Sequence, residues 1–307
     1  MLRGLEVADL TDALIRAEPA PASRAALERV HPPEFIEAIE AACSTGARID
    51  ADTAVSTGSW TAALLAAGAG LTAVDAMTAG AADAAFCAVR PPGHHATPTQ
   101  AMGFCLFNNV AVTASALAAG GERVLIVDYD AHHGNGTQAA FYDDDRVAYV
   151  SIHQWPLYPG TGAAGERGSG EGSGTTLNVP LPPGATGDVF RAAVDELVLP
   201  LAERFQPTWL MLSAGFDGHR RDPLTGLALA AGDYADLTRT LLALVPAGRR
   251  LIFLEGGYDL EALADSAGAA VAAAAGVDHR PEPATSGGPG RDVVDALVER
   301  GRQEAAG

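Results

Sequence analysis

The chain has 307 residues and a formal net charge of −18, with 38 acidic residues, 20 arginines and no lysine. Hydrophobic residues make up 48% and charged residues 19%, so the chain can bury a core and is not disordered as a whole. Its length suits one large α/β domain or two small ones. The acidity argues against nucleic-acid binding and against attraction to anionic membranes, and it favours steering of a cationic substrate.

The cysteines and the N-terminus indicate a reduced, cytoplasmic setting. Cys43, Cys87 and Cys105 are too few and too scattered for a disulfide framework. The first ten residues lack the charged and then apolar pattern of a signal peptide. The most apolar stretch, residues 60–85, is interrupted by two aspartates, which favours one or two buried helices over a membrane span.

Helices are predicted in the first part of the chain. Residues 8–45 have a helical pattern in two pieces, broken at His31-Pro32-Pro33. Residues 60–85 are also predicted to be helical, with glycines marking breaks.

From residue 86 onward, short apolar runs of the kind found in strands buried on both faces of a parallel sheet alternate with helix-like segments. The apolar runs are 86–89, 124–127, 147–150, 177–179, 209–212 and 251–254, and the helix-like segments include 110–119, 189–205 and 234–245. This alternation predicts an α/β fold with helices on both faces of the sheet. We expect one catalytic domain over residues 1–280 and a peripheral C-terminal tail over residues 281–307, where the sequence becomes rich in Pro and Gly and then ends in a short charged helix.

Polar, glycine-rich motifs follow almost every apolar run, where an open parallel sheet binds its ligands. The strongest motif is DYDAHHGNG, which begins at Asp128 directly after the run 124–127. Residues two apart in an extended segment point the same way, so Asp130 and His132 make a natural ligand pair for a divalent cation. Asp217, after the run 209–212, is the best candidate for a third ligand. The alternative is that Asp130 and His132 only cap a helix or stabilise a turn.

Two further motifs offer proton transfer and an oxyanion donor. His94 and His95 follow a stiff Arg-Pro-Pro-Gly segment, and histidine is the side chain best suited to move a proton near neutral pH. Tyr258 follows two glycines at another strand end, from which its hydroxyl can reach a cleft. The alternatives are a hydrogen-bonded loop histidine pair and a packed aromatic ring. Together with a metal, these groups would hydrolyse an amide or an ester.

The motifs resemble those of the histone deacetylase family of zinc amidohydrolases, most closely its class II branch and bacterial relatives. They are RPPGHHA, GFCLFNNVA, DYDAHHGNGTQ, YPGTG, NVP, AGFDGHRRDPL and LEGGYD, and they run in order from Arg90 to Asp259. The resemblance implies an arginase-like three-layer α/β domain, with a mainly parallel sheet and the active site at the carboxyl ends of the strands.

The resemblance also implies roles for single residues. Asp130, His132 and Asp217 match the zinc ligands, a set that Fe²⁺ or Co²⁺ could also occupy. His95 matches the general base and acid, and His94 an electrostatic partner. Asp128 and Asn135 match the groups behind His94 and His95, respectively. Asn135 replaces a possible aspartate, as is common in class II, and an amide raises the pKa of the imidazole less than a carboxylate would. Tyr258 matches the oxyanion donor.

The family's acyl-lysine tunnel would be lined by Gly103, Phe104 and Tyr158, with Leu224 at the mouth. Polyamine-selecting relatives carry an acidic residue at the position of Leu224, so an acyl-lysine-like substrate is favoured.

The family's structural potassium site would use Asp128, Asp130, His132, Ser151 and Ile152. The related arginases use a second carboxylate in an Asp-x-His-x-Asp pattern, but position 134 is Gly, which disfavours two metals.

The predicted activity is zinc-dependent deacylation of an acylated amine, most simply acetyl-lysine. The alternatives are an acetylpolyamine or small-metabolite amidohydrolase, and a catalytically weak protein that binds acyl-lysine. We expect no nucleic-acid or membrane partner, and a homo-oligomer is left open. The sequence does not contain the strand and His-Pro-Glu-rich loop with which family members usually begin. Either the start is misassigned, or this member lacks them, which would alter the rim of the pocket.

Overall fold

The structure is a computed structural model that describes residues 1–306. It contains one six-stranded sheet in which every neighbouring pair of strands is parallel, in the order β1-β6-β5-β2-β3-β4. The strands are β1 (Ala85–Cys87), β2 (Val124–Asp128), β3 (Val147–Gln154), β4 (Thr176–Leu181), β5 (Trp209–Ala214) and β6 (Arg250–Leu254). The predicted α/β fold with a parallel sheet is therefore confirmed.

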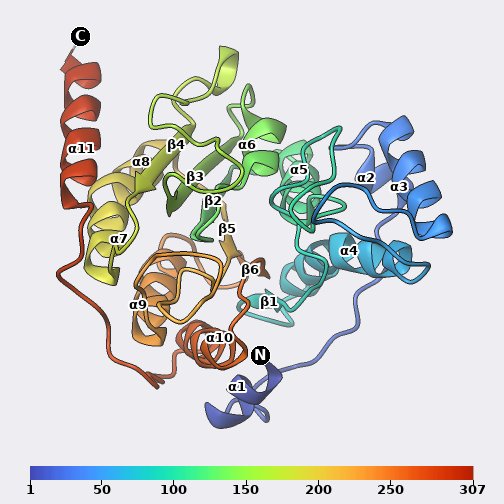
Figure 1. Ribbon diagram of the computed structural model, residues 1–307, viewed down its shortest axis with the longest axis horizontal. Helices are drawn as coiled ribbons and strands as arrows, with labels where there is room; N and C mark the ends of the chain where they lie inside the picture. The colour runs from blue at the N-terminus through green and yellow to red at the C-terminus, as the bar shows by residue number, and fades with distance from the viewer. Residues whose placement is uncertain (307) are drawn as a thin grey trace.

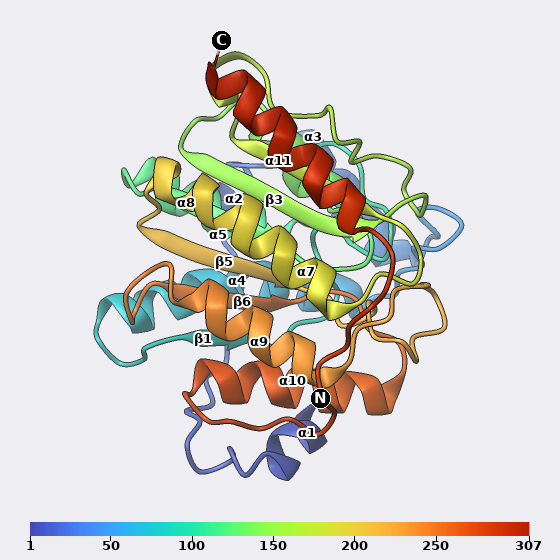
Figure 2. The same cartoon turned by 90° about the vertical axis from the view of Figure 1, so that its left-hand side faces the viewer.

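Helices cover both faces of the sheet, as Figures 1 and 2 show. They are α1 (Leu2–Val7), α2 (Arg24–Leu27), α3 (Pro33–Thr45), α4 (Ser59–Thr78), α5 (Asn109–Ala119), α6 (Asn135–Phe141), α7 (Gly187–Ala193), α8 (Leu199–Phe205), α9 (Ala231–Leu242), α10 (Leu260–Ala274) and α11 (Arg291–Ala306). A π-helical turn, η2 (Val194–Val198), joins α7 to α8, and a short 3₁₀ turn, η1 (Gly170–Gly172), precedes β4.

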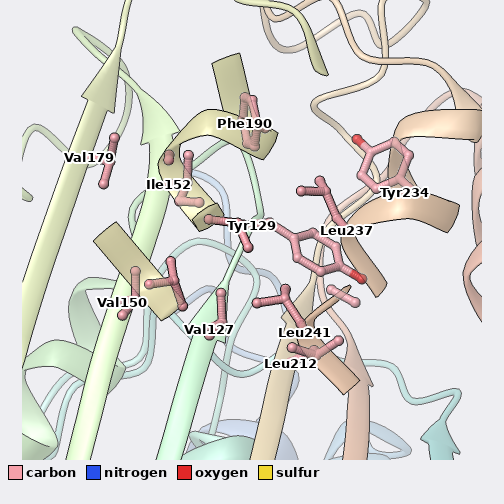
Figure 3. Close-up of a cluster of buried hydrophobic side chains, with 14 of the residues drawn as sticks. Val127, Tyr129, Val150, Ile152, Val179, Phe190, Leu212, Tyr234, Leu237 and Leu241 are labelled. Carbon is pink, nitrogen blue, oxygen red and sulfur yellow. The ribbon is translucent and has the colours of Figure 1, made fainter. Parts of the chain in front are cut away.

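The larger part of the core lies between the sheet and the helices α7 to α11. Figure 3 shows Val127, Val150 and Leu212, from three strands, on the same side as Leu237 and Leu241 of α9. These side chains are at most 1% exposed. Strands buried on both faces need apolar residues at successive positions, which is why continuous apolar runs identified them.

Two predictions about the first helices are corrected. Residues 8–23 contain no helix, and Pro19 and Pro21 lack the backbone N–H groups that a helix interior needs. The helix predicted over residues 60–85 is unbroken at Gly68 and Gly70, but it ends at Thr78, before Gly80. A Cβ at Gly68 would lie 1.9 Å from the carbonyl oxygen of Ala20, so this glycine permits close packing within a continuous helix.

Helix α4 is long and apolar enough to cross a membrane by length and composition alone. It packs against α3, α5, β1 and β6 within the domain, as expected for a core helix.

The C-terminal segment, predicted to be a peripheral tail, contributes to the core. Val294 and Leu297 of α11 are 0% and 6% exposed and belong to the main apolar cluster. Helix α11 packs on α7, η2 and β4, as its position beside α7 in Figure 2 illustrates.

Candidate metal centre and reaction pocket

The sheet brings the candidate metal ligands together, although they are far apart in the sequence. Strands β2 and β5 are neighbours, with Asp128 in register with Ser213. Asp130 and His132 follow β2, and Asp217 follows β5. Because the strands are parallel, both turns lie at the same edge of the sheet.

One potential ligand atom from each of these three residues lies within 4.8 Å of the other two. His132 Nδ1 is 3.1 Å from Asp130 Oδ1 and 2.9 Å from Asp217 Oδ2. Backbone N–H groups hold the carboxylates in place, from Gly256 to Asp130 Oδ2 at 2.7 Å and from Ala131 to Asp217 Oδ1 at 2.9 Å. The three residues therefore form a compact, oriented cluster.

Two glycines make room for these carboxylates. A Cβ at Gly215 would lie 2.0 Å from Asp130 Oδ2, and a Cβ at Gly256 would lie 2.4 Å from Asp217 Oδ2. Glycine is therefore required at both positions, because any other side chain would displace a candidate ligand.

The electrostatics of the cluster fit a divalent cation. Both carboxylates are fully buried, and among the ion pairs of residues 1–306 they contact only histidines. Burial alone would lower the pKa of His132, but the negative charges of Asp217 and Asp130 outweigh it and raise this pKa to about 11. One imidazole and two carboxylates that need a compensating positive charge suit Zn²⁺, Fe²⁺ or Co²⁺.

The tandem histidines lie beside this cluster in different environments. His94 Nδ1 is 3.0 Å from Asp128 Oδ2, whereas His95 Nδ1 is 2.9 Å from Asn135 Oδ1. Burial lowers the pKa of His94, but Asp128 and other carboxylates outweigh this and raise it to about 10. Burial and the neighbouring charge of His94 instead hold the pKa of His95 well below its usual range. His94 is therefore the protonated member of the pair and His95 the neutral one.

Glu255 binds the backbone of the segment that carries the first histidine. Its buried Oε2 accepts hydrogen bonds from the backbone N–H groups of Gly93, at 2.7 Å, and His94, at 3.2 Å. Burial raises the pKa of this carboxyl group to about 7. Glu255 thus joins the ends of β1 and β6 directly behind the histidine pair.

The position of Tyr258 depends on a residue to which the sequence analysis assigned no role. Asp222 Oδ2 accepts the backbone N–H of Tyr258 at 2.7 Å, and its Oδ1 accepts the N–H of Leu224 at 3.0 Å. The ring of Tyr258 lies 5.9 Å from the ring of Phe104, edge to face. Asp222 was visible only as part of an Asp-Pro pair, and no spacing rule connects it to a residue 36 positions away.

Two further contacts that support the candidate site, made by Met102 and Tyr149, could not be predicted from the sequence. Met102 Sδ accepts the Nδ2 of Asn135 at 3.4 Å, which turns the amide oxygen toward His95. The Tyr149 hydroxyl donates to Asp128 Oδ2 at 3.1 Å. Neither residue lies in a motif with a recognisable spacing, so only the fold reveals them.

Two of the residues predicted to line the acyl tunnel, Gly103 and Tyr158, lie against His95. The Tyr158 ring stands edge-on to His95, with centroids 5.2 Å apart and an interplanar angle of 89°. Phe104, Tyr158 and Leu224 are 40%, 39% and 47% exposed, and their role in lining a substrate tunnel stays a prediction. Gly103 has a φ of +56°, and a Cβ there would lie 2.4 Å from His95 Cδ2.

The predicted potassium site includes residues of two neighbouring strands. Asp128 of β2 is in register with Ser151 of β3, and Ile152 follows. Ser151 Oγ lies 2.9 Å from His153 Nδ1. Cation binding at Asp128, Asp130, His132, Ser151 and Ile152 stays a prediction.

Comparisons with known proteins agree with this arrangement. The histone deacetylase domain family matches residues 1–274. A "Probable deacetylase" of Archaeoglobus fulgidus is 43% identical over 255 residues, which are 82% of this chain and 71% of the relative. A "Histone deacetylase-like amidohydrolase" of Pseudomonas aeruginosa is 41% identical over 265 residues, 83% of this chain and 69% of the relative. The chain spans about half the length of two plant chloroplast relatives that it also matches.

A solved structure has the same fold. The crystal structure of the HDA15 HD domain superposes with a TM-score of 0.87 and 36% sequence identity, covering 97% of this chain and 85% of that one. The family match extends from α1 to the end of α10 and so includes all six strands and every candidate site residue. The chain therefore belongs to the histone deacetylase family, with its arginase-like fold.

Proposed function

We propose that the protein is a zinc-dependent amidohydrolase that removes an acetyl or similar short acyl group from a lysine-like amine. The observation that carries this proposal is the convergence of Asp130, His132 and Asp217 beside two histidines whose pKa values are shifted in opposite directions. Hydrolase activity follows from membership of the family, and the names of the bacterial and archaeal relatives support deacylation.

Zn²⁺ held by these three residues would polarise the substrate carbonyl and lower the pKa of a bound water. His95 is suited to be the general base. Its Nδ1–H donates to Asn135 Oδ1, which leaves Nε2 free to accept a proton from the attacking water. Protonated His94, paired with Asp128, contributes positive charge without exchanging its proton.

The remaining steps use the same groups. As the water oxygen bonds to the carbonyl carbon, the Tyr258 hydroxyl donates a hydrogen bond to the carbonyl oxygen, where negative charge develops. His95 then returns its proton to the amine nitrogen, and the carbon–nitrogen bond breaks to give a carboxylic acid and an amine. The remaining proton of the acid passes to the amine, so that a carboxylate and an ammonium ion leave. Phe104 and Tyr158 would hold the aliphatic stem of the amine.

The test is turnover of an acetyl-lysine peptide by metal-depleted protein, before and after addition of one equivalent of Zn²⁺. We expect activity only after reloading, and none in a His95→Ala variant that still binds metal. Acetylspermidine and longer acyl-lysines run in parallel, because higher kcat/KM on acetylspermidine would favour the polyamine alternative. A folded, zinc-loaded protein that hydrolyses no acylated amine would refute the proposal and favour a binding role.

A further inference from the structure

The segment that follows α10 returns to the loop that carries a candidate metal ligand. Figures 1 and 2 show this segment running from α10 past α9 to α11. It begins at residue 275, directly after the part of the chain that the family matches. Within it, Glu282 contacts the loop after β5, 63 positions earlier in the sequence.

Glu282 makes three contacts at the start of α9 and in this loop. Its Oε2 lies 2.6 Å from His219 Nε2 and accepts the backbone N–H of Ala231 at 3.2 Å. Its Oε1 accepts Arg220 Nη2 at 2.7 Å. The side chain of His219 is completely buried, so Glu282 supplies the partner that this inward-facing imidazole needs.

The chemistry of His219 fixes the direction of these hydrogen bonds. Its Nδ1 accepts the backbone N–H of Arg221 at 3.1 Å, so Nε2 carries the proton and donates it to Glu282. The backbone of His219 continues the connection, because its carbonyl oxygen accepts the N–H of Asp222 at 2.8 Å. Asp222 in turn holds the N–H of Tyr258.

The same loop contains Asp217, two residues before His219. Between the end of β5 at Ala214 and the start of α9 at Ala231 the backbone forms turns and an isolated bridge rather than helix or strand. Such a loop depends on side-chain contacts for its conformation. Glu282 is one end of a chain of contacts that passes through His219 and Asp222 to Tyr258.

We propose that Glu282 is a positioning residue for the reaction. By holding His219, it fixes the loop from Gly215 to Leu224, and with it Asp217 and the Asp222 contact to Tyr258. The C-terminal segment beyond the family match is therefore part of the machinery that shapes the pocket. This inference rests on the proposed function for its effect on turnover, but its effect on the loop and on metal binding does not.

The test compares three variants of the full chain: Glu282→Ala, Glu282→Gln and Asp278→Ala. Asp278 is the matched control, because it lies on the same segment and pairs with Arg239 and Arg280 without reaching the loop. The measurements are hydrogen exchange of peptides covering residues 215–224, affinity for Co²⁺ against a competing chelator, and kcat and KM on an acetyl-lysine peptide.

For Glu282→Ala we expect faster exchange in residues 215–224, metal affinity about tenfold weaker and a similar fall in kcat, as when a support behind a metal ligand is removed. Glu282→Gln retains an acceptor for His219 and should recover part of each loss. If the alanine variant does not fold, the same measurements on Glu282→Gln still test the proposal. Asp278→Ala should match the wild type.

Exchange and Co²⁺ affinity that are the same in the Glu282 variants as in Asp278→Ala would overturn the proposal. If both properties change but the wild type hydrolyses no acylated amine, the proposed function fails and the positioning role stands.

Discussion

Gly103 offers a direct test of how closely the pocket wall is fitted to the candidate base. Its φ of +56° lies in the left-handed region, and an added Cβ would lie 2.4 Å from His95 Cδ2. Gly103→Ala therefore introduces two separable effects. One is the strain of the backbone conformation, and the other is a collision with the imidazole.

The two effects differ in size and in what they change. An alanine held at positive φ costs about 1 kcal/mol of folding free energy. Relief of the collision to an ordinary contact of 3.4 Å requires His95 or the Gly103 loop to move by about 1 Å, and a misplacement of that size in a reacting group lowers the rate by roughly 100-fold. The substitution should therefore affect catalysis more than stability.

The control is Gly80→Ala. Gly80 has a φ of +75° and nothing within 4 Å of its added Cβ. Denaturant unfolding should show a loss of about 1 kcal/mol from backbone strain in Gly80→Ala and a somewhat larger loss in Gly103→Ala, where the collision adds to the strain, whereas kcat on an acetyl-lysine peptide should fall only in Gly103→Ala. Equal kcat values in the two variants would refute the inferred contact between the pocket wall and His95.

Three further predictions follow from individual side chains. Tyr258→Phe should lower kcat by about 10² to 10³ with metal content unchanged, because one oxyanion donor is lost; unaltered kinetics would remove Tyr258 from the mechanism. Zn²⁺ at 100 times its Kd should stabilise the wild type by about 2.7 kcal/mol in a thermal shift assay but not Asp217→Asn, which lacks a ligand charge. Stability should also fall as the pH drops from about 6.5 toward 4, because burial lowers the pKa of His31 from 6.5 to about 4 and the unfolded chain takes up the proton first. The full effect is roughly 3 kcal/mol, and a His31→Gln variant whose stability has the same pH dependence as the wild type would contradict this assignment.

The strands could be predicted because their environment imposes a local pattern. A strand in the middle of a covered parallel sheet is buried on both faces, so runs such as residues 124–127 and 209–212 are continuously apolar. The polar motifs directly after these runs indicated which edge of the sheet carries the site, because an open parallel sheet binds ligands at the carboxyl ends of its strands. Asp130 and Asp217 could be paired before the structure was known, because both follow such runs.

Residues that act through long-range contacts have no local pattern. Asp222 holds Tyr258 across 36 positions and Glu282 holds His219 across 63, and each looks in the sequence like an ordinary loop acid. Composition was also misleading for the C-terminal segment. Its prolines, glycines and charges predicted a peripheral tail, yet it supplies Glu282 and two buried residues of the core.

The groups closest to the proposed chemistry are held by partners from other parts of the fold, whereas the side chains at the rim are exposed. His95 is fixed by Asn135, and the backbone of Tyr258 by Asp222. Phe104 and Leu224, in contrast, are about half exposed, and a change in an exposed side chain disturbs few other contacts. Substitution at Leu224 should therefore alter which amine enters the pocket with little effect on the groups that would hydrolyse it. Selection among acylated amines can thus change at the rim while the reaction itself is retained.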